Sequence, residues 1–347
     1  MKNLIDYLYQ FERRLVSPIY GIECDCGFAC MDKVAIAEDL GFESEDSGIV
    51  VNVVPHSFDT LADVEAFPWN ISLNGTHAKA ELAHVSKWFA NDPKLHGGGC
   101  FGPLTVTACI LGVENCCRMV RKKPTVIHAI LRRVTDFMIL LAREEARCGA
   151  DCFWIAEPVA ALLSPAACHR FCTPYLKEIY DASGVPGVLH VCGDTTPHMQ
   201  ALFDTGAQMI SLDYCTDLPA YLAQAPADMI IMGNINPMLL WKGTLEDVRQ
   251  EVESLLVQTR HYKNFIMSSG CQVPWSAPRE NVQLMVDLTK SFPTWTNDEF
   301  RLITRLWNVL CDEGQDAFNA VCQAEQVPSP IAEAAKVIAV QRLAYRH

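Results

Sequence analysis

The chain has 347 residues and carries 28 Lys and Arg against 41 Asp and Glu, which gives a formal charge of −13. Because 50% of the residues are hydrophobic and 20% are charged, a disordered or fibrous chain is excluded and a large folded core is expected. The negative charge argues against a nucleic-acid partner, since phosphates would be repelled. No apolar run has membrane-spanning length, and residues 1–10 lack the basic flank and apolar stretch of a signal peptide. We therefore expect a cytoplasmic protein with no nucleic-acid and no membrane partner.

Two further compositional features have plain interpretations. Sixteen cysteines in a chain of this length, without a leader, indicate free thiols in a reducing cytosol rather than a disulfide framework. The basic run from Arg118 to Lys123 precedes Pro124 and a helical pattern. We interpret it as a solvated segment that connects helices, in preference to a patch for phosphate or for a partner.

The N-terminal part of the chain is the hardest to interpret. Residues 1–95 mix helical patterns with short apolar runs such as 49–54, and we expect them to form a segment that caps one end of a larger fold. Residues 97–102 are rich in glycine and are followed by Pro103 and a β-like run over 104–107. This pattern predicts a loop that enters a strand.

From about residue 105 onward, helical patterns alternate with short β-rich runs. The clearest predicted strands are residues 151–156, 187–191, 208–212, 228–232 and 264–268. Helical patterns lie between them, as over 164–182 and 244–260. Continuous apolar strands separated by helices indicate a parallel sheet covered on both faces, which is either an open doubly wound sheet or a closed barrel.

The positions of the polar residues favour the barrel. Side chains that can carry chemistry fall at or just beyond the ends of five successive predicted strands: Glu157, His190 with Cys192, Asp213, Asn234 and Cys271. Five strands converge most easily at the mouth of a barrel. An open sheet usually recruits a glycine-rich phosphate loop, and no G-x-G-x-x-G or Walker sequence stands in the right context. The sequence therefore predicts an α/β fold, a (β/α)8 TIM barrel.

We expect the barrel over residues 96–293, with a start that can lie earlier, and a C-terminal helical extension over 294–347. Amphipathic patterns predict helices over 298–319 and 331–345, joined through residues 328–330. This extension packs on the barrel, forms a homodimer or docks a partner.

His190, Cys192 and Cys271 form the most informative group. Residues i and i+2 of a strand point to the same side, so His190 and Cys192 can reach one ion, and Cys271 can join them from a later strand. One imidazole and two thiolates suit zinc, and three protein ligands leave a position open for substrate. The alternative is that small buried thiols fall at strand ends by chance, but the spacing favours zinc. Three other thiols lack a partner pattern and are expected in the core or in helices: Cys148, Cys152 and Cys215.

Four polar residues near these strand ends each have two interpretations. Asp213 is a displaceable fourth ligand or a base that accepts a thiol proton, or it caps a helix. Glu157 faces the cavity, or pairs with a core Arg or a backbone amide. Asn234 donates hydrogen bonds into the mouth or holds its loop, and Asp194 caps the next helix or contacts a ligand. We take Asp213 and Glu157 as catalytic candidates, and Asn234 and Asp194 as substrate-binding candidates.

Several motifs carry a family resemblance: residues 190–194 (His-Val-Cys-Gly-Asp), 157–160 followed by 163–165, 233–235, and 270–271 with Pro274. Together they resemble the uroporphyrinogen decarboxylase superfamily, and more specifically its zinc-dependent corrinoid methyltransferase branch, which includes methylcobamide:coenzyme M methyltransferases. The similarity covers about residues 98–290. True decarboxylases of this superfamily have an arginine-rich N-terminal motif, where this chain has an acidic, cysteine-bearing segment over 17–26. Such an entrance disfavours a polyanionic porphyrinogen.

The resemblance implies that His190, Cys192 and Cys271 hold Zn²⁺, and that a methyl group moves between a corrinoid and a small methyl donor or acceptor. The favoured acceptor is a zinc-bound thiol such as coenzyme M. The chain has no Asp-x-His-x-x-Gly loop, so the corrinoid is expected on a separate cobalamin-binding protein. The same site can act in the opposite direction, as a demethylase of a methyl ether. Two less favoured functions are a metal-free decarboxylase or lyase and a non-enzymatic corrinoid chaperone.

Overall fold

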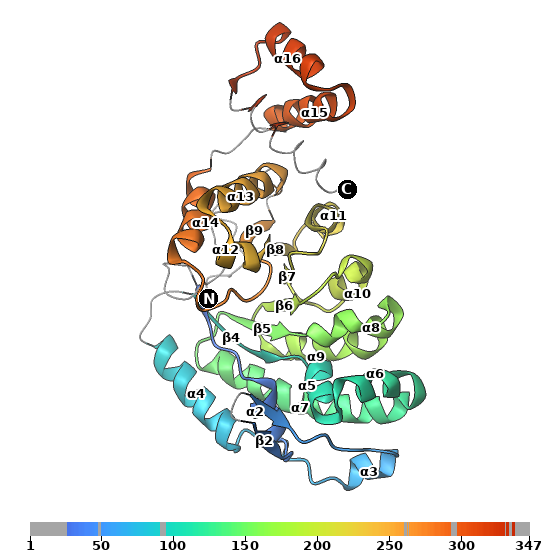
Figure 1. Cartoon of the computed structure of the whole chain (residues 1–347). Coiled ribbons are helices and arrows are strands. Elements are labelled where there is room, and N and C mark those ends of the chain that lie inside the picture. Colours follow the sequence, from blue (N-terminus) through green and yellow to red (C-terminus); the bar gives the residue numbers. More distant parts are fainter. Residues whose placement is uncertain are drawn as a thin grey trace.

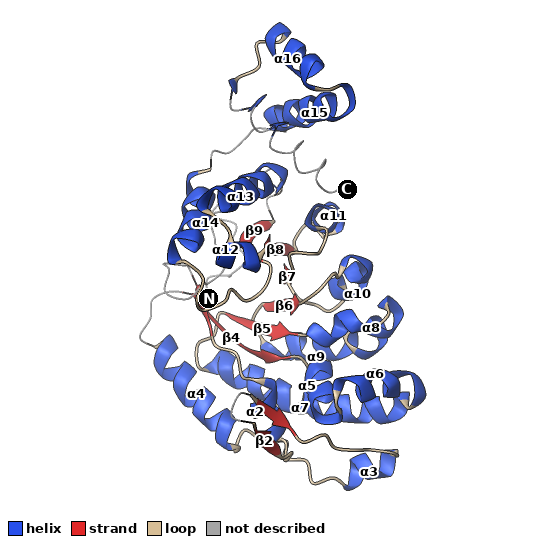
Figure 2. Ribbon diagram, viewed as in Figure 1, coloured by secondary structure: helices blue, strands red, loops and turns tan. Residues whose placement is uncertain are grey.

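A parallel sheet of seven strands forms the centre of the molecule (Figures 1 and 2). The computed structural model describes residues 26–47, 50–90, 95–259, 262, 264–292, 297–329, 331–332 and 335–336. In spatial order, the strands are β1 (Cys26–Phe28), β4 (Leu95–Phe101), β5 (Cys152–Ala156), β6 (Gly187–Val191), β7 (Met209–Leu212), β8 (Ile230–Ile235) and β9 (Phe265–Ser269). Each strand of this sheet pairs with the next one along the chain. The order never reverses, as it would in a doubly wound sheet, so the predicted α/β barrel architecture is confirmed.

Helices follow the strands and cover the outside of this sheet (Figure 2). They are α5 (Pro103–Leu111), α6 (Val113–Lys122) and α7 (Pro124–Arg147) after β4; α8 (Pro165–Phe171) and α9 (Thr173–Ser183) after β5; α10 (Met199–Phe203) after β6; α11 (Leu218–Gln224) after β7; α12 (Pro237–Lys242) and α13 (Leu245–Thr259) after β8; and α14 (Arg279–Ser291) after β9. Proline opens several of them, because the first helical position needs no amide donor.

The strands bury two different faces. Alternate residues such as Phe153 and Ile155 belong to the large core between sheet and helices. The other face forms a small apolar cluster inside the barrel: Cys152, Val188, Met209, Ile230, Met232 and Ile266, with Trp154 against it. Because strand side chains alternate, the next inward positions toward the strand ends are His190, Ser211, Asn234 and Ser268, all buried. A polar layer therefore lies above an apolar plug.

The five predicted strands and the helix predicted over 244–260 are present, with bounds shifted by a few residues. The single helix predicted over 164–182 is instead two helices, α8 and α9, which meet at Cys172. The sheet also contains β1, so the barrel begins before residue 95, as the sequence left open. The N-terminal part adds the hairpin of β2 (Ser44–Asp46) and β3 (Val51–Val53), and the helices α2 (Lys33–Asp39), α3 (Leu61–Ala66) and α4 (Thr76–Phe89). The basic run forms the end of α6 rather than a connecting segment, and Lys123 pairs with Asp59.

The prediction for the glycine-rich stretch is wrong. It is not a loop but strand β4 itself, and residues 104–107 lie in helix α5 rather than in a strand. A Cβ atom on Gly98 would lie 2.1 Å from Oε2 of Glu145, and one on Gly99 would lie 2.2 Å from the carbonyl oxygen of Trp154. The glycines thus make room for neighbours that are distant in sequence, and Pro103 marks the helix start.

The C-terminal helices form a separate cluster beyond α13 (Figure 1). The single helix predicted over 298–319 is two helices, α15 (Asn297–Glu313) and α16 (Gln315–Ala324), because Gly314 adopts a φ of 87° between them. Leu306 and Phe318 pack in one buried group with Val257 of α13. Most of the helix predicted over 331–345 lies outside the described residues. None of the helices that the structure describes is long and apolar enough to cross a membrane.

Candidate metal centre

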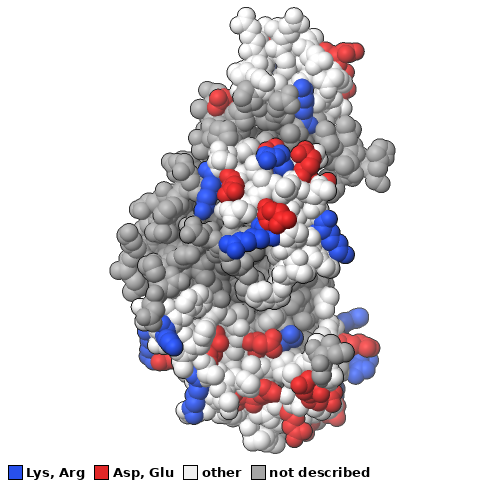
Figure 3. Space-filling view, turned by 60° about the vertical axis from the view of Figure 1, so that its left-hand side comes forward, with Lys and Arg blue, Asp and Glu red and all other residues white. Residues whose placement is uncertain are grey.

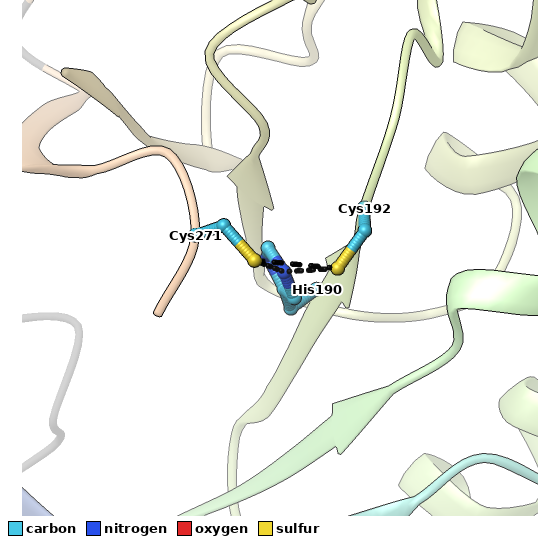
Figure 4. A group of neighbouring side chains, drawn as sticks. All are labelled: His190, Cys192 and Cys271. Atoms are coloured by element: carbon cyan, nitrogen blue, oxygen red, sulfur yellow. Dashed lines mark hydrogen bonds between the residues drawn. The ribbon is translucent and has the colours of Figure 1, made fainter. Parts of the chain in front are cut away.

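His190, Cys192 and Cys271 converge at the ends of the strands (Figure 4). Nε2 of His190 lies 3.1 Å from Sγ of Cys192 and 3.8 Å from Sγ of Cys271, and the two sulfur atoms are 3.5 Å apart. Both cysteines are free thiols. Within the described parts of the chain, no other three His, Cys, Asp or Glu side chains gather as closely.

These distances suit a single tetrahedral zinc ion. Zinc bound to sulfur at about 2.3 Å and to nitrogen at about 2.0 Å places neighbouring ligand atoms about 3.5 to 3.8 Å apart. The three observed separations lie close to this range. Three donors occupy three corners of the tetrahedron, which leaves the fourth for another ligand. The residues therefore fit a zinc site of the catalytic kind.

Strand β6 supplies His190 and leads into Cys192, and β7 orients the imidazole. His190 pairs in register with Ser211, and Nδ1 of His190 lies 3.1 Å from Ser211 Oγ and 3.3 Å from Ser211 O. The ring of Trp154 stacks beside the imidazole, with centroids 5.9 Å apart. Since Nδ1 is engaged, Nε2 faces the two sulfur atoms. Sequence reasoning missed Ser211; its signal was a polar residue at an inward position of an apolar strand.

Cys271 reaches this group from the loop after β9 because that loop folds tightly across the mouth. The amide of Gly270 donates to the carbonyl of Ile235 at 2.7 Å. A Cβ atom on Gly270 would lie 2.3 Å from the backbone nitrogen of Tyr214, in the loop after β7. Glycine thus lets the two loops touch and brings Cys271 to a strand that is not its neighbour in the sheet.

The two thiols titrate as a pair. Hydrogen bonds from Cys192 and His190 lower the pKa of Cys271 to about 4. The hydrogen bond to Cys271, together with burial, raises the pKa of Cys192 well above its usual value. One proton is therefore shared between the sulfur atoms, with Cys271 as the thiolate, which is the form in which cysteine binds a metal.

Asp213 and Asn234 brace the loops around the centre. Oδ2 of Asp213 accepts from the amide of Gly193 and Oδ1 from that of Tyr214, both at 2.7 Å. Nδ2 of Asn234 donates to the carbonyls of Asp213 and Thr216, both at 3.0 Å. The contacts of Asn234 match the loop-holding interpretation. Asp213 accepts from amides of two loops and not from the first turn of a helix, since the N-cap of α11 is Asp217.

Asp194 is exposed and accepts from the amide of Thr196 at 2.9 Å, as a cap does. Hydrogen bonds from the hydroxyl and the amide of Thr196 lower its pKa. Cys215 was expected in the core or a helix, but it is exposed in the loop after β7. Cys152 is buried as expected, and Cys148 caps the end of α7.

Glu157 is buried against the start of α5. Its side chain is 0% exposed, and it accepts hydrogen bonds from the amides of Leu104 at 2.9 Å and Thr105 at 2.6 Å, and from the Thr105 hydroxyl. Glu157 therefore caps the first turn of α5, and Gly102 lacks the side chain that would collide with it. Burial raises the pKa of this carboxyl to about 7. Of the two interpretations offered by the sequence, these contacts match the pairing of Glu157 with backbone amides.

An α/β barrel with a His-Cys-Cys group at the C-terminal ends of its strands has the architecture of a barrel enzyme, whose active site lies at that end. The chain belongs to the uroporphyrinogen decarboxylase (URO-D) family, whose match spans residues 16–292. The sequence resemblance to this family is thereby confirmed.

Its relatives include both methyltransferases and decarboxylases. It is 29% identical over 262 residues to a methylcobamide:CoM methyltransferase, MtbA, of Methanosarcina mazei, covering 73% of this chain and 75% of the relative. A methylated-thiol–coenzyme M methyltransferase of the same organism is 27% identical, covering 58% of this chain and 55% of the relative. A uroporphyrinogen decarboxylase of Arabidopsis thaliana is 29% identical, covering 48% of this chain and 42% of the relative. The resemblance to the corrinoid methyltransferase branch is thus supported over most of the chain.

The fold has a counterpart among solved structures. A methyltransferase from Methanosarcina mazei superposes with a TM-score of 0.67 at 21% sequence identity, covering 78% of this chain and 81% of that one. This likeness confirms the fold.

Replacing Ser211 by Ala removes the partner of His190 Nδ1. We expect the affinity for zinc to fall by about tenfold, because partners of metal-binding imidazoles typically contribute at least that much. Competition with a chromogenic chelator measures it. Ser268→Ala, at the same depth on β9, is the matched control and should bind zinc as the wild type does. Equal affinity of the Ser211→Ala variant would show that Ser211 does not orient the ligand.

Gly270→Ala adds a Cβ atom where the backbone of Tyr214 lies. We expect the loop to be displaced and zinc content at limiting metal to fall several-fold, with a loss of stability of about 1–3 kcal/mol. Gly184→Ala is a suitable control, since Gly184 has a positive φ of 75° but open space around it, far along the chain from the loop. Full zinc loading of Gly270→Ala would contradict the role given to this contact.

The raised pKa of Glu157 predicts that the stability of the protein depends on pH. The pKa of Glu157 is about 7 in the folded protein and 4.5 in the unfolded chain. The protonated carboxyl therefore stabilises the folded protein fully below pH 4.5, and this stabilisation is lost as the pH rises through 7. Relative to Glu157→Gln, the wild type should lose about 2–3 kcal/mol between pH 4.5 and pH 8. Urea unfolding of both proteins across this range measures the difference. Parallel stability curves would mean that folding does not raise the pKa of Glu157.

Proposed function

We propose that the protein is a zinc-dependent methyltransferase that moves a methyl group between a corrinoid on a partner protein and a small substrate, with a small thiol as the acceptor. The observation that carries this proposal is the tetrahedral spacing of His190, Cys192 and Cys271 at the ends of the barrel strands. Two of the relatives are named for a small thiol, coenzyme M, which supports the class of acceptor but does not define its charge in this chain.

Zinc at this site would lower the pKa of a thiol bound at the fourth position from its usual value of about 8.5, so that the thiolate predominates at neutral pH. The chain's own residues prepare the site. Cys192 and Cys271 give up their shared proton when metal binds. Ser211 holds the imidazole of His190, and Asp213 and Asn234 hold the loops through backbone contacts.

The transfer balances without another reactant. A lone pair on the substrate sulfur forms the new S–C bond while the Co–C bond of the methylated corrinoid breaks. The electron pair of that bond stays on cobalt, which passes from Co(III) to Co(I), and the thiol proton goes to solvent. The barrel mouth positions the two reactants in line.

Exposed apolar side chains around the mouth support a corrinoid partner. Leu162, Tyr214, Met238 and Trp275 follow β5, β7, β8 and β9, with exposed fractions of 62%, 48%, 42% and 74%. Large apolar side chains exposed together mark a site for a partner. A macrocycle face and the protein that carries it would cover these residues and keep water from the reacting atoms.

Cys271→Ser tests the proposal directly. We expect one zinc per wild-type chain, little zinc in the variant, and a loss of methyl transfer from methylcobalamin to thiols of about 100-fold or more. Elemental mass spectrometry and thioether formation are the readouts. Cys148→Ser, which removes a thiol at the end of α7, should change neither. Zinc and activity retained in Cys271→Ser, or no zinc in any of these proteins, would refute the site and leave a metal-free lyase as the better interpretation.

A further inference from the structure

The loops that surround the metal centre are composed of neutral and acidic residues. They are the segments between each strand of the main sheet and the α-helix that follows it: residues 29–32, 102, 157–164, 192–198, 213–217, 236 and 270–278. Their sequences contain five Asp or Glu residues, at 32, 157, 194, 213 and 217, and no Lys or Arg. Glu157 is buried against α5, so the four aspartates carry the negative charge of these described loops.

The acidic groups closest to the ligands in the fold follow β6 and β7. Asp194 comes two residues after Cys192 and is exposed, and Asp217 is exposed in the next loop. Asp213, at the start of that same loop, accepts from the amide of Gly193, the residue after Cys192. Partial burial raises the pKa of the Cys215 thiol, and the charges of Asp213 and Asp194 raise it further, as expected for carboxylates close to this loop.

Across these loops and the first residue of each helix that follows them, basic side chains stand only at the margin. Lys33 and Arg279 are the first residues of α2 and α14. Lys33 lies 3.8 Å from Asp32 and sits over the ring of Phe101 at 4.8 Å. Elsewhere, Lys and Arg are interspersed with Asp and Glu on the described part of the face in Figure 3. The one histidine of the loops, His198, is buried against the carbonyl of Leu163.

A negatively charged mouth selects among thiols by the charge at their far end. A substrate held by its sulfur at the metal places its other end within a few ångströms of these loops. An anionic group there meets carboxylates and backbone carbonyls, and these described loops contain no Lys or Arg to pair with it. A neutral or cationic group needs no such partner. We propose that the acceptor of this enzyme is a small thiol without negative charge, either uncharged or cationic. This inference rests on the proposed methyltransferase function.

Three thiols of equal length test the inference, because they differ only in the group on the second carbon. They are 2-mercaptoethanol, 2-aminoethanethiol and 2-mercaptoethanesulfonate, with methylcobalamin as the methyl donor and the zinc-loaded full chain as the enzyme. We expect kcat/KM, corrected for the thiolate fraction of each free thiol, to be at least about tenfold higher for the neutral and the cationic thiol than for the sulfonate. The difference should shrink at high ionic strength, since salt screens the loops.

A pair of variants separates the charge of these loops from the charge of the whole chain. Asp194→Asn with Asp217→Asn keeps both capping hydrogen bonds, because Asn caps as well as Asp does. In this double variant, kcat/KM for the sulfonate should rise, so that the ratio between the other two thiols and the sulfonate falls several-fold. Asp181→Asn with Glu253→Gln changes the net charge equally on the outer helices α9 and α13, and should leave the preference unchanged.

The outcomes distinguish the two proposals. If the sulfonate reacts as well as the other two thiols or better, the inference is wrong while the methyltransferase function stands. An equal effect of both double variants also overturns it, since net charge would then account for the preference. If zinc is bound but none of the thiols is methylated, the thiol acceptor of the proposed function fails, and the inference fails with it.

Discussion

Parallel, in-register pairing of β6 with β7 is the interaction on which the candidate site depends. It sets His190 opposite Ser211, so that one ring nitrogen is engaged and the other faces the mouth. The alternation of side chains along each strand then places Cys192 on the same side as His190. Below them, the apolar cluster inside the barrel fills the space that water would otherwise occupy. The candidate ligands therefore lie directly above a packed apolar cluster.

The third ligand, Cys271, makes the site a property of the whole barrel. Cys271 belongs to a loop after β9, and it meets β6 because Gly270 lets that loop touch the backbone after β7. Any change that opens the barrel between β7 and β9 would separate the ligands. Metal binding and the closure of this end of the fold are therefore thermodynamically coupled, as they are in other sites assembled from distant segments.

The carboxylates near the mouth show how structural roles shape a reaction environment. Asp213, Asp194 and Asp217 each accept backbone amides, so they order the loops. Their charges remain, and two of them are exposed beside the metal ligands. The aspartates that order these loops thus also give the entrance a negative charge, and this charge affects which substrates and partners approach it. The relatives named for coenzyme M are similar to this chain in sequence, and the charge of these loops is the feature from which we infer a different preference.

The sequence by itself determined the features that follow from local patterns. The alternation of apolar runs and helical patterns predicted the strands and the barrel order, and the spacing of His190 and Cys192 predicted a shared ligand side. It did not determine what fills the space around each residue. Three features depend on neighbours about 20 or more residues away along the chain: the glycine-rich strand β4, the contact of Glu157 with the start of α5, and the contact of Ser211 with His190. Only the tertiary structure decides such contacts, because a side chain's partners are set by packing between elements and not by its own periodicity.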